Sequence, residues 1–183
     1  FVTTLIIWII YFKAKDLGNS DVGHWGFNIK IKRLISTGVV LVGLQIFLGA
    51  WTSTNYASLS CSDFPLCQGQ ILPPANFSEG FNFFQNVGPN YLGGLLDHES
   101  RVAIHLTHRL GALVVTVFLI YLIWSLYLEG LKRVPTVLAG VLVFQIGLGI
   151  SNVIFGLPLL IAVAHNLGGL LLITCLSVLR FRD

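Results

Sequence analysis

Four long apolar segments constrain this chain more than any other feature. They cover residues 34–52, 102–128, 135–155 and 158–179, and a helix needs ~20 apolar residues to cross a bilayer. Only 10% of the residues are charged and 55% are hydrophobic, whereas a soluble domain carries roughly 25% charge. Because lipid admits only helices and closed barrels, we predict an all-α integral membrane protein in which the four segments form a helix bundle.

A shorter apolar stretch, "FVTTLIIWIIYF", covers residues 1–12. It is too short to span a bilayer, and it lacks the charged start and the cleavage site of a signal peptide. We interpret it as the tail of a truncated transmembrane helix, and we expect the chain to be a fragment of a longer protein.

Positive charges predict the orientation of the bundle. The loop of residues 53–100 contains neither Lys nor Arg, whereas the cytoplasmic side of a membrane protein is enriched in both. In a four-crossing model three basic clusters fall together on the side opposite this loop. They are Lys13, Lys15, Lys30, Lys32 and Arg33 in loop 13–33, then Lys132 and Arg133, and then Arg180 and Arg182. We therefore expect an inner-membrane protein with loop 13–33 in the cytoplasm and loop 53–100 outside, where its aromatic residues favour a lid over a solvated connector.

Two motifs recur in the same order. "LQIFLG" (44–49) resembles "FQIGLG" (144–149), and "HRLGALVVT" (108–116) resembles "HNLGGLLLIT" (165–174). The repeats pair Gln45 with Gln145, Gly49 with Gly149, His108 with His165, and Gly111 with Gly168. The segment 34–183 therefore reads as two helix hairpins of the same orientation, related by an axis along the membrane normal.

The repeated histidines are the candidate ligands. At ~1.5 Å per residue, His108 and His165 each lie roughly 10 Å below the outer end of their helix, on symmetry-related helices. Small residues follow each histidine on the same face, three and four positions later, Gly111 among them in the first hairpin and Gly168 in the second. They serve either close helix packing or the entry of a flat macrocycle, and opposed histidines are axial ligands of haem iron.

Other readings of these polar residues remain open. A membrane histidine often makes an interhelical hydrogen bond, and zinc is disfavoured because it needs three or four clustered ligands. His105 is either a third polar group of the pocket or a partner of a haem propionate, while Arg109 and Arg101 either pair with a propionate or extend toward water. His98 is expected to be solvated, and His24 receives no role.

Two cysteines lie in the long loop, in "SCSDFPLCQG". Cys61 and Cys67 face an oxidising compartment in this topology, which favours a local disulfide over free thiols, and a labile redox disulfide is a further possibility. Cys175 is expected to be an inert apolar residue.

These segments resemble the haem A synthase family. The loop "GAWTSTNYASLSCSDFPLCQG" and the motifs "THRLGAL" and "AHNLGG" are similar to that family's signatures, from the first hairpin to the last. The resemblance implies eight crossings in two homologous halves, with this chain as the second half. It implies haem b as the cofactor of His108 and His165, and a disulfide between Cys61 and Cys67.

The resemblance also implies a reaction. Haem A synthases oxidise a methyl group of haem O to a formyl group, with water as the oxygen source and an unknown electron acceptor. The family's catalytic half carries a glutamate one turn before its first histidine, where this chain has His105, so the fragment alone is expected to be incompetent. Expected partners are haem O and haem A, haem O synthase, cytochrome oxidase assembly factors and membrane lipid, and no nucleic acid. The alternatives are a b-type cytochrome electron carrier and a haem-binding assembly or transport protein.

Overall fold

The computed structural model describes residues 26–84 and 96–181, and these residues form helices and loops without a β-strand. Four helices are long and apolar enough to cross a membrane, as predicted. They are α2 (Ile29–Thr54), α4 (His98–Leu128), α5 (Arg133–Ile154) and α6 (Leu159–Phe181), and a short α3 (Phe77–Gly80) lies in the loop. The truncated helix predicted at residues 1–12, most of loop 13–33, and His24 lie outside the described residues.

Capping side chains extend two helices beyond the apolar segments that predicted them. The Asn28 side chain accepts a hydrogen bond from the Ile31 amide at 3.0 Å, so α2 starts five residues before the predicted boundary. The Asp97 side chain accepts one from the Ser100 amide at 2.7 Å, so α4 starts four residues early. A polar cap satisfies backbone donors at the first turn of a helix. The predicted boundaries followed the apolar residues alone, so they left out the polar first turns. The long loop is therefore shorter than the predicted 53–100.

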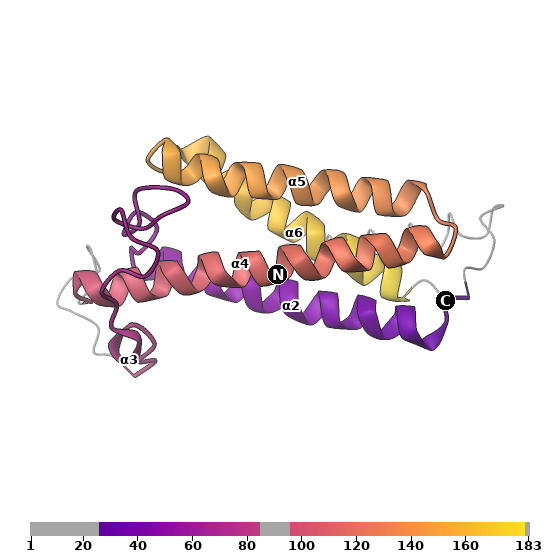
Figure 1. Cartoon of the computed structure of the whole chain (residues 1–183), viewed down its shortest axis with the longest axis horizontal. Helices are drawn as coiled ribbons and strands as arrows, with labels where there is room; N and C mark the ends of the chain where they lie inside the picture. Colours follow the sequence, from indigo (N-terminus) through magenta and orange to yellow (C-terminus); the bar gives the residue numbers. More distant parts are fainter. Residues whose placement is uncertain (1–25, 85–95, 182–183) are drawn as a thin grey trace.

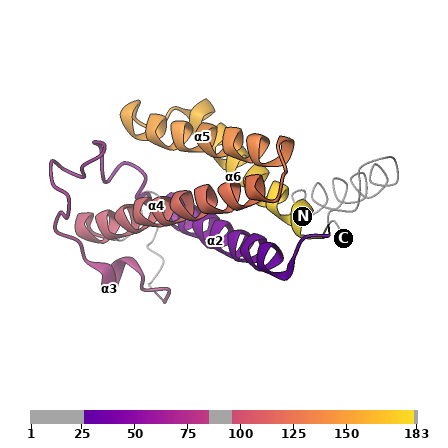
Figure 2. The ribbon, with the colours of Figure 1, turned by 45° about the vertical axis from the view of Figure 1, so that its right-hand side comes forward.

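The four long helices form a ring of neighbours. α2 packs against α4 and α6, and α5 packs against the same two helices, as Figures 1 and 2 show. Among the described residues, no Cα atom of α4 lies within 8 Å of a Cα atom of α6, and the same holds for α2 and α5. α4 and α6 are therefore diagonal in the bundle, and side chains that point inward from both meet across its centre.

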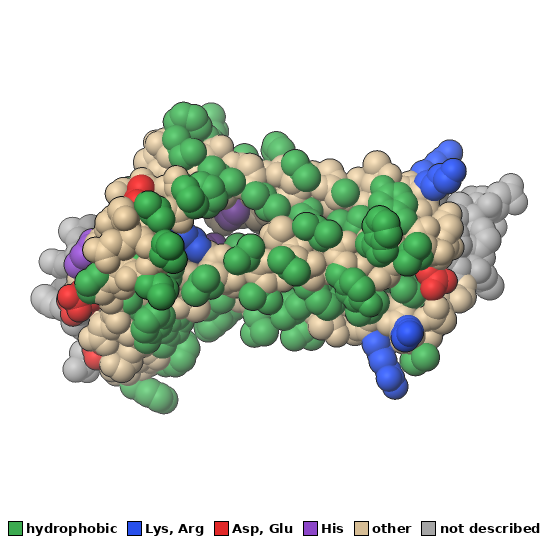
Figure 3. Space-filling model, viewed as in Figure 1, with side chains coloured by type: hydrophobic (Ala, Val, Ile, Leu, Met, Phe, Trp, Pro, Cys, Tyr) green, Lys and Arg blue, Asp and Glu red, His purple; other side chains and the backbone are tan. Residues whose placement is uncertain are grey.

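The apolar core occupies the half of the bundle away from the loop. Its buried members come from all four helices: Ile31, Ile35, Val42, Val115, Leu119, Leu122, Ile123, Leu126, Leu138, Leu142, Leu172, Leu176 and Leu179. The other half, toward the loop, is more open. Figure 3 shows a hollow between α4 and α5 near the loop end, with histidine side chains visible inside it.

The loop packs on the ends of α2 and α4. The Trp51 indole donates to the Gly80 carbonyl at 3.0 Å, and the Trp51 ring lies 4.8 Å from that of Phe83, centroid to centroid. We expected the loop aromatics to leave water, and this is only partly so, because Phe83 is 57% exposed and Phe84 is 95% exposed. Aromatic rings of this kind are common at membrane–water interfaces.

Candidate functional site

His108 and His165 come from the two diagonal helices. His108 is on α4 and His165 is on α6, and both side chains are half-buried. The His108 ring faces Gly49 of α2, and the His165 ring faces Gly149 of α5. The structure thus places the pair that the repeat singled out on two diagonal helices, each ring against the neighbouring helix of its own hairpin.

A glutamine from the neighbouring helix holds His108. Gln45 on α2 places its amide nitrogen 2.9 Å from the His108 carbonyl oxygen and 3.0 Å from His108 Nδ1. The side chain therefore fixes both the backbone and the ring of this histidine. Its oxygen, Oε1, is buried and has no hydrogen-bond partner among the described residues.

The second hairpin repeats this arrangement with one difference. Gln145 on α5 donates to the His165 carbonyl at 3.0 Å. However, His165 Nδ1 is buried without a hydrogen-bond partner in the described part of the chain, and so is Gln145 Oε1. The two histidines are alike in backbone contacts and unlike in the contacts of their rings.

The repeated glycines make room for these contacts. A Cβ at Gly49 would lie 3.2 Å from His108 Cε1, and a Cβ at Gly149 would lie 3.0 Å from His165 Cε1. A Cβ at Gly111 would collide with Gln45 Oε1, and one at Gly168 would collide with Gln145 Oε1. The space over Gly111 and Gly168, which we expected to admit a macrocycle, therefore receives a glutamine carboxamide, so these small residues serve helix packing. Whether they also border a cofactor remains a prediction.

The residues fit a haem group in two respects. The hollow of Figure 3 lies at the level of histidines between α4 and α5. Among the residues that the structure describes, neither His108 nor His165 uses Nε2 in a hydrogen bond, and this nitrogen commonly ligates metals.

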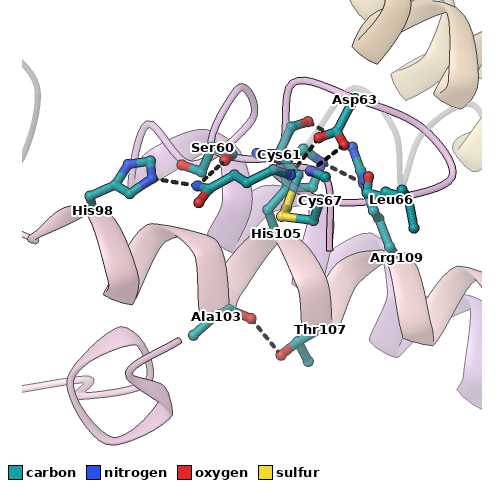
Figure 4. The surroundings of a disulfide bond; sticks show 12 residues. Ser60, Cys61, Asp63, Leu66, Cys67, His98, Ala103, His105, Thr107 and Arg109 are labelled. Carbon is teal, nitrogen blue, oxygen red and sulfur yellow. Dashed lines mark hydrogen bonds between the residues drawn. A yellow bond between two sulfur atoms is a disulfide. The ribbon is translucent and has the colours of Figure 1, made fainter. Parts of the chain in front are cut away.

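His105 and Arg109 point toward the loop around the disulfide (Figure 4). Arg109 donates to the carbonyls of Leu66 at 2.8 Å and Cys61 at 2.7 Å. His105 is 4% exposed, with Nδ1 3.3 Å from the Cys61 amide and Nε2 3.3 Å from Arg109 Nε. A neutral imidazole has one acceptor nitrogen, so only one of these two contacts is a full hydrogen bond at a time. Both ring nitrogens nevertheless face the loop and Arg109, and the propionate roles remain predictions.

Cys61 and Cys67 form the expected disulfide. The two residues are 0% and 2% exposed, so the bond is buried beneath the loop surface, which disfavours the labile redox reading based on exposure. Gln68 and Gly69, both with positive φ, turn the chain so that Cys67 and Gln70 exchange backbone hydrogen bonds. Glycine adopts such a conformation without steric cost. Cys175 is free and half-buried on α6.

Charged and polar side chains make further hydrogen bonds within the loop and at the start of α4. Asp63 accepts hydrogen bonds from the Gly69 amide at 2.8 Å and the Gln68 amide at 2.6 Å, and the Gly69 bond in particular lowers the pKa of the carboxyl. His98 is exposed, as expected, but its Nε2 also contacts the Gln68 side chain. Arg101 is half-buried near the start of α4, about two helical turns before His108.

Gln45 and Gln145 are the site residues that sequence reasoning missed. The repeat was interpreted as a sign of symmetry, and the glutamines were not assigned to the site. A signal was present, because each glutamine stands four residues before a glycine that faces a histidine ring. Residues at i and i+4 share a helix face, so the glutamine and the ring-facing glycine could have been placed together.

Comparisons with known proteins agree with these motifs. A family model described as cytochrome oxidase assembly protein matches residues 1–177. The chain is 41% identical over 143 residues to a protein named heme A synthase from Shewanella oneidensis, covering 78% of this chain and 43% of that protein. It is 30% identical to a heme A synthase from Neorickettsia sennetsu, covering 78% of this chain and 41% of that protein.

Longer alignments exist at lower identity. A heme A synthase from Orientia tsutsugamushi is 24% identical over 94% of this chain and 48% of its own length. The chain thus spans less than half the length of these curated relatives. No solved structure matches it significantly.

Proposed function

Since the chain belongs to the haem A synthase family, we propose that it forms the C-terminal, haem b-binding half of a membrane oxidoreductase that converts haem O to haem A. The observation that carries this proposal is the matched histidine pair on diagonal helices, with each histidine braced by a glutamine from its neighbour. Relatives named heme A synthase support the activity.

His108 and His165 would hold the iron of haem b through Nε2. A histidine that ligates through Nε2 carries its proton on Nδ1, and a second group normally accepts that proton. In the structure the Gln45 amide nitrogen, which is a donor, lies against His108 Nδ1. Ligation through Nε2 would therefore require the carboxamide to turn its unpartnered oxygen toward the Nδ1 proton. Bound haem b would supply one-electron redox chemistry.

Because both histidines would be committed to holding the group, the chemistry that it would supply here is electron transfer and not substrate activation. We therefore propose that this half relays electrons or supports the structure, and that oxidation of the haem O methyl group takes place in the homologous half. The glutamate of that half has His105 as its counterpart here. Because His105 faces the disulfide loop, we assign it a role in holding the loop and not in proton transfer.

Charge supports the proposed topology. Most of the described basic residues lie at the end opposite the loop (Figure 3), whereas Arg101 and Arg109 lie at the loop end. The end with more basic residues is cytoplasmic by the positive-inside rule. The loop with its disulfide then lies outside the inner membrane. A cysteine introduced at the exposed Ser62 should be labelled in intact cells by a membrane-impermeant maleimide if this orientation is correct, and labelling only after the membrane is broken would contradict it.

Pigment analysis tests the function. The full-length protein is expressed with haem O synthase, purified from membranes, and its haems are extracted and separated. We expect haem b together with haem O and haem A. Haem b alone would favour the b-type cytochrome carrier, and the absence of any haem would contradict the proposed cofactor site and leave a transport or structural role.

A further inference from the structure

Gln45 and Gln145 occupy equivalent places in the two hairpins but contact their histidines differently. Each carboxamide donates through Nε2 to the carbonyl of the histidine on the other helix of its hairpin, at 2.9 Å for His108 and 3.0 Å for His165. A carbonyl only accepts hydrogen bonds, so the nitrogen of each carboxamide must face it. The backbone therefore fixes the orientation of both carboxamides.

The Gln45 nitrogen also lies 3.0 Å from His108 Nδ1. A carboxamide nitrogen donates two hydrogen bonds and accepts none. Since one of its protons goes to the His108 carbonyl, the other is available to Nδ1, and Nδ1 must be the acceptor. A neutral imidazole whose Nδ1 accepts carries its proton on Nε2. Gln45 thus selects the Nε2-protonated tautomer of His108.

The Gln45 carboxamide is held in this orientation. Its oxygen lies over Gly111, where an added Cβ would collide with it, and the oxygen is buried without a hydrogen-bond partner among the described residues. A half-turn that brought the oxygen to His108 Nδ1 would also bring it to the His108 carbonyl, and two acceptors would then face each other. The amide nitrogen therefore stays against Nδ1.

His165 is under no such constraint. The two rings lie in similar places, because a Cβ at Gly149 would be 3.0 Å from His165 Cε1 and a Cβ at Gly49 would be 3.2 Å from His108 Cε1. Nδ1 of His165 is nevertheless buried without a hydrogen-bond partner in the described part of the chain. The proton of this ring is free to take either nitrogen.

We propose that Gln45 is a positioning residue that holds the His108 proton on Nε2, and that it thereby makes His165 the stronger of the two ligands. The second part rests on the proposed function. Histidine ligates a metal through an unprotonated nitrogen. To use Nε2, His108 has to move its proton to Nδ1 and displace the Gln45 amide, whereas His165 has no contact at Nδ1 to break.

The tautomer is measured by ¹⁵N NMR of the full-length protein with isotope-labelled histidine, produced in cells that cannot synthesise haem. Protonated and unprotonated ring nitrogens give separate signals, and those of His108 are identified by their loss in His108→Ala. Gln45→Met removes the contact to the ring. Gln145→Met is the matched control, because it removes an equivalent carbonyl contact and leaves the His108 ring untouched.

We expect His108 to be protonated at Nε2 in the wild type and in Gln145→Met, and to become a mixture of tautomers in Gln45→Met. Gly111→Ala displaces the same carboxamide from α4 and should give the same mixture, which keeps the test decisive if Gln45→Met folds poorly. A wild-type proton on Nδ1, or an Nε2 proton that persists in both variants, would overturn the tautomer assignment. Since no haem is present, this result is independent of the proposed function.

The second measurement compares the two ligands one at a time. Haem b is titrated into His108→Ala, which keeps His165, and into His165→Ala, which keeps His108, with the double variant as the blank. Gln45 stays in all of these proteins, because its removal would also free the His108 ring.

We expect His108→Ala to bind haem b about fivefold more tightly than His165→Ala, as the loss of one net hydrogen bond would give. Equal affinities, or tighter binding by the protein that keeps His108, would overturn the inequality of the ligands. A wild-type protein that binds no more haem than the blank would contradict the proposed function itself.

Discussion

Replacement of Gly111 by alanine tests whether the Gln45 side chain fixes His108 in the candidate site. A Cβ at this position would collide with Gln45 Oε1, so the carboxamide must leave its place. The variant then loses two hydrogen bonds, to the His108 carbonyl at 2.9 Å and to His108 Nδ1 at 3.0 Å.

The magnitude follows from these contacts. Each hydrogen bond contributes about 0.5–1.5 kcal/mol net, so their loss costs about 1–3 kcal/mol. Alanine recovers at most about 1 kcal/mol through its better helix propensity. We therefore expect Gly111→Ala to lower the free energy of unfolding by about 1 kcal/mol and to weaken haem retention, because His108 is no longer fixed.

The assay is thermal unfolding in detergent, followed by circular dichroism and by the haem absorption band. Gly147→Ala is the matched control, since a Cβ there has no neighbour within 4 Å. It should be neutral or slightly stabilising. An unchanged or raised Tm and an unchanged haem band for Gly111→Ala, equal to the control, would refute the reasoning.

The loop carries three further predictions. Asp63→Asn should increase the rate of amide hydrogen exchange at residues 67–70 at neutral pH. Because folding lowers the pKa of the Asp63 carboxyl, the wild-type protein should exchange more slowly than the variant above a pH of ~4, and this difference should fade as the pH falls through the folded pKa. A difference that does not depend on pH would contradict the prediction. In denaturant without reductant, alkylation followed by peptide mass spectrometry should label Cys175 alone, and reductant should add Cys61 and Cys67; labelling of all three before reduction would refute the disulfide. Arg109→Gln should raise the rate of proteolysis within the loop, because two carbonyl contacts are lost, and an unchanged cleavage rate would show that the arginine does not anchor it.

The membrane helices and their repeat could be predicted from the sequence because both depend on local patterns. Apolar segments of sufficient length specify helices in lipid. The two copies of the glutamine and histidine motifs identified equivalent helices without any knowledge of contacts. The helix starts at Ile29 and His98 were missed because polar caps, not apolar residues, determine them.

The contacts of the site were less accessible to sequence reasoning. His105 and Arg109 were expected near a cofactor because they share a helix with His108. The structure turns them to the carbonyl and amide groups of a loop more than 40 residues earlier in the chain. Such long-range backbone contacts leave no periodic signal in the sequence.

The two histidines of the site differ in their ring contacts, and the repeated sequence motifs do not indicate this difference. His108 Nδ1 has a glutamine against it, whereas His165 Nδ1 is buried without a hydrogen-bond partner among the described residues. Hydrogen bonding to an axial ligand tunes the potential of a haem. The asymmetry therefore makes the two proposed ligands distinguishable by experiment.

Absorption and electron paramagnetic resonance spectra of the His108→Ala and His165→Ala variants show whether these two rings hold one iron. We predict that the purified wild-type protein shows a low-spin, bis-histidine haem b signal, and that either substitution abolishes this signal while Gly147→Ala leaves it intact. A low-spin signal that survives in both histidine variants would contradict the assignment of these two rings to one iron.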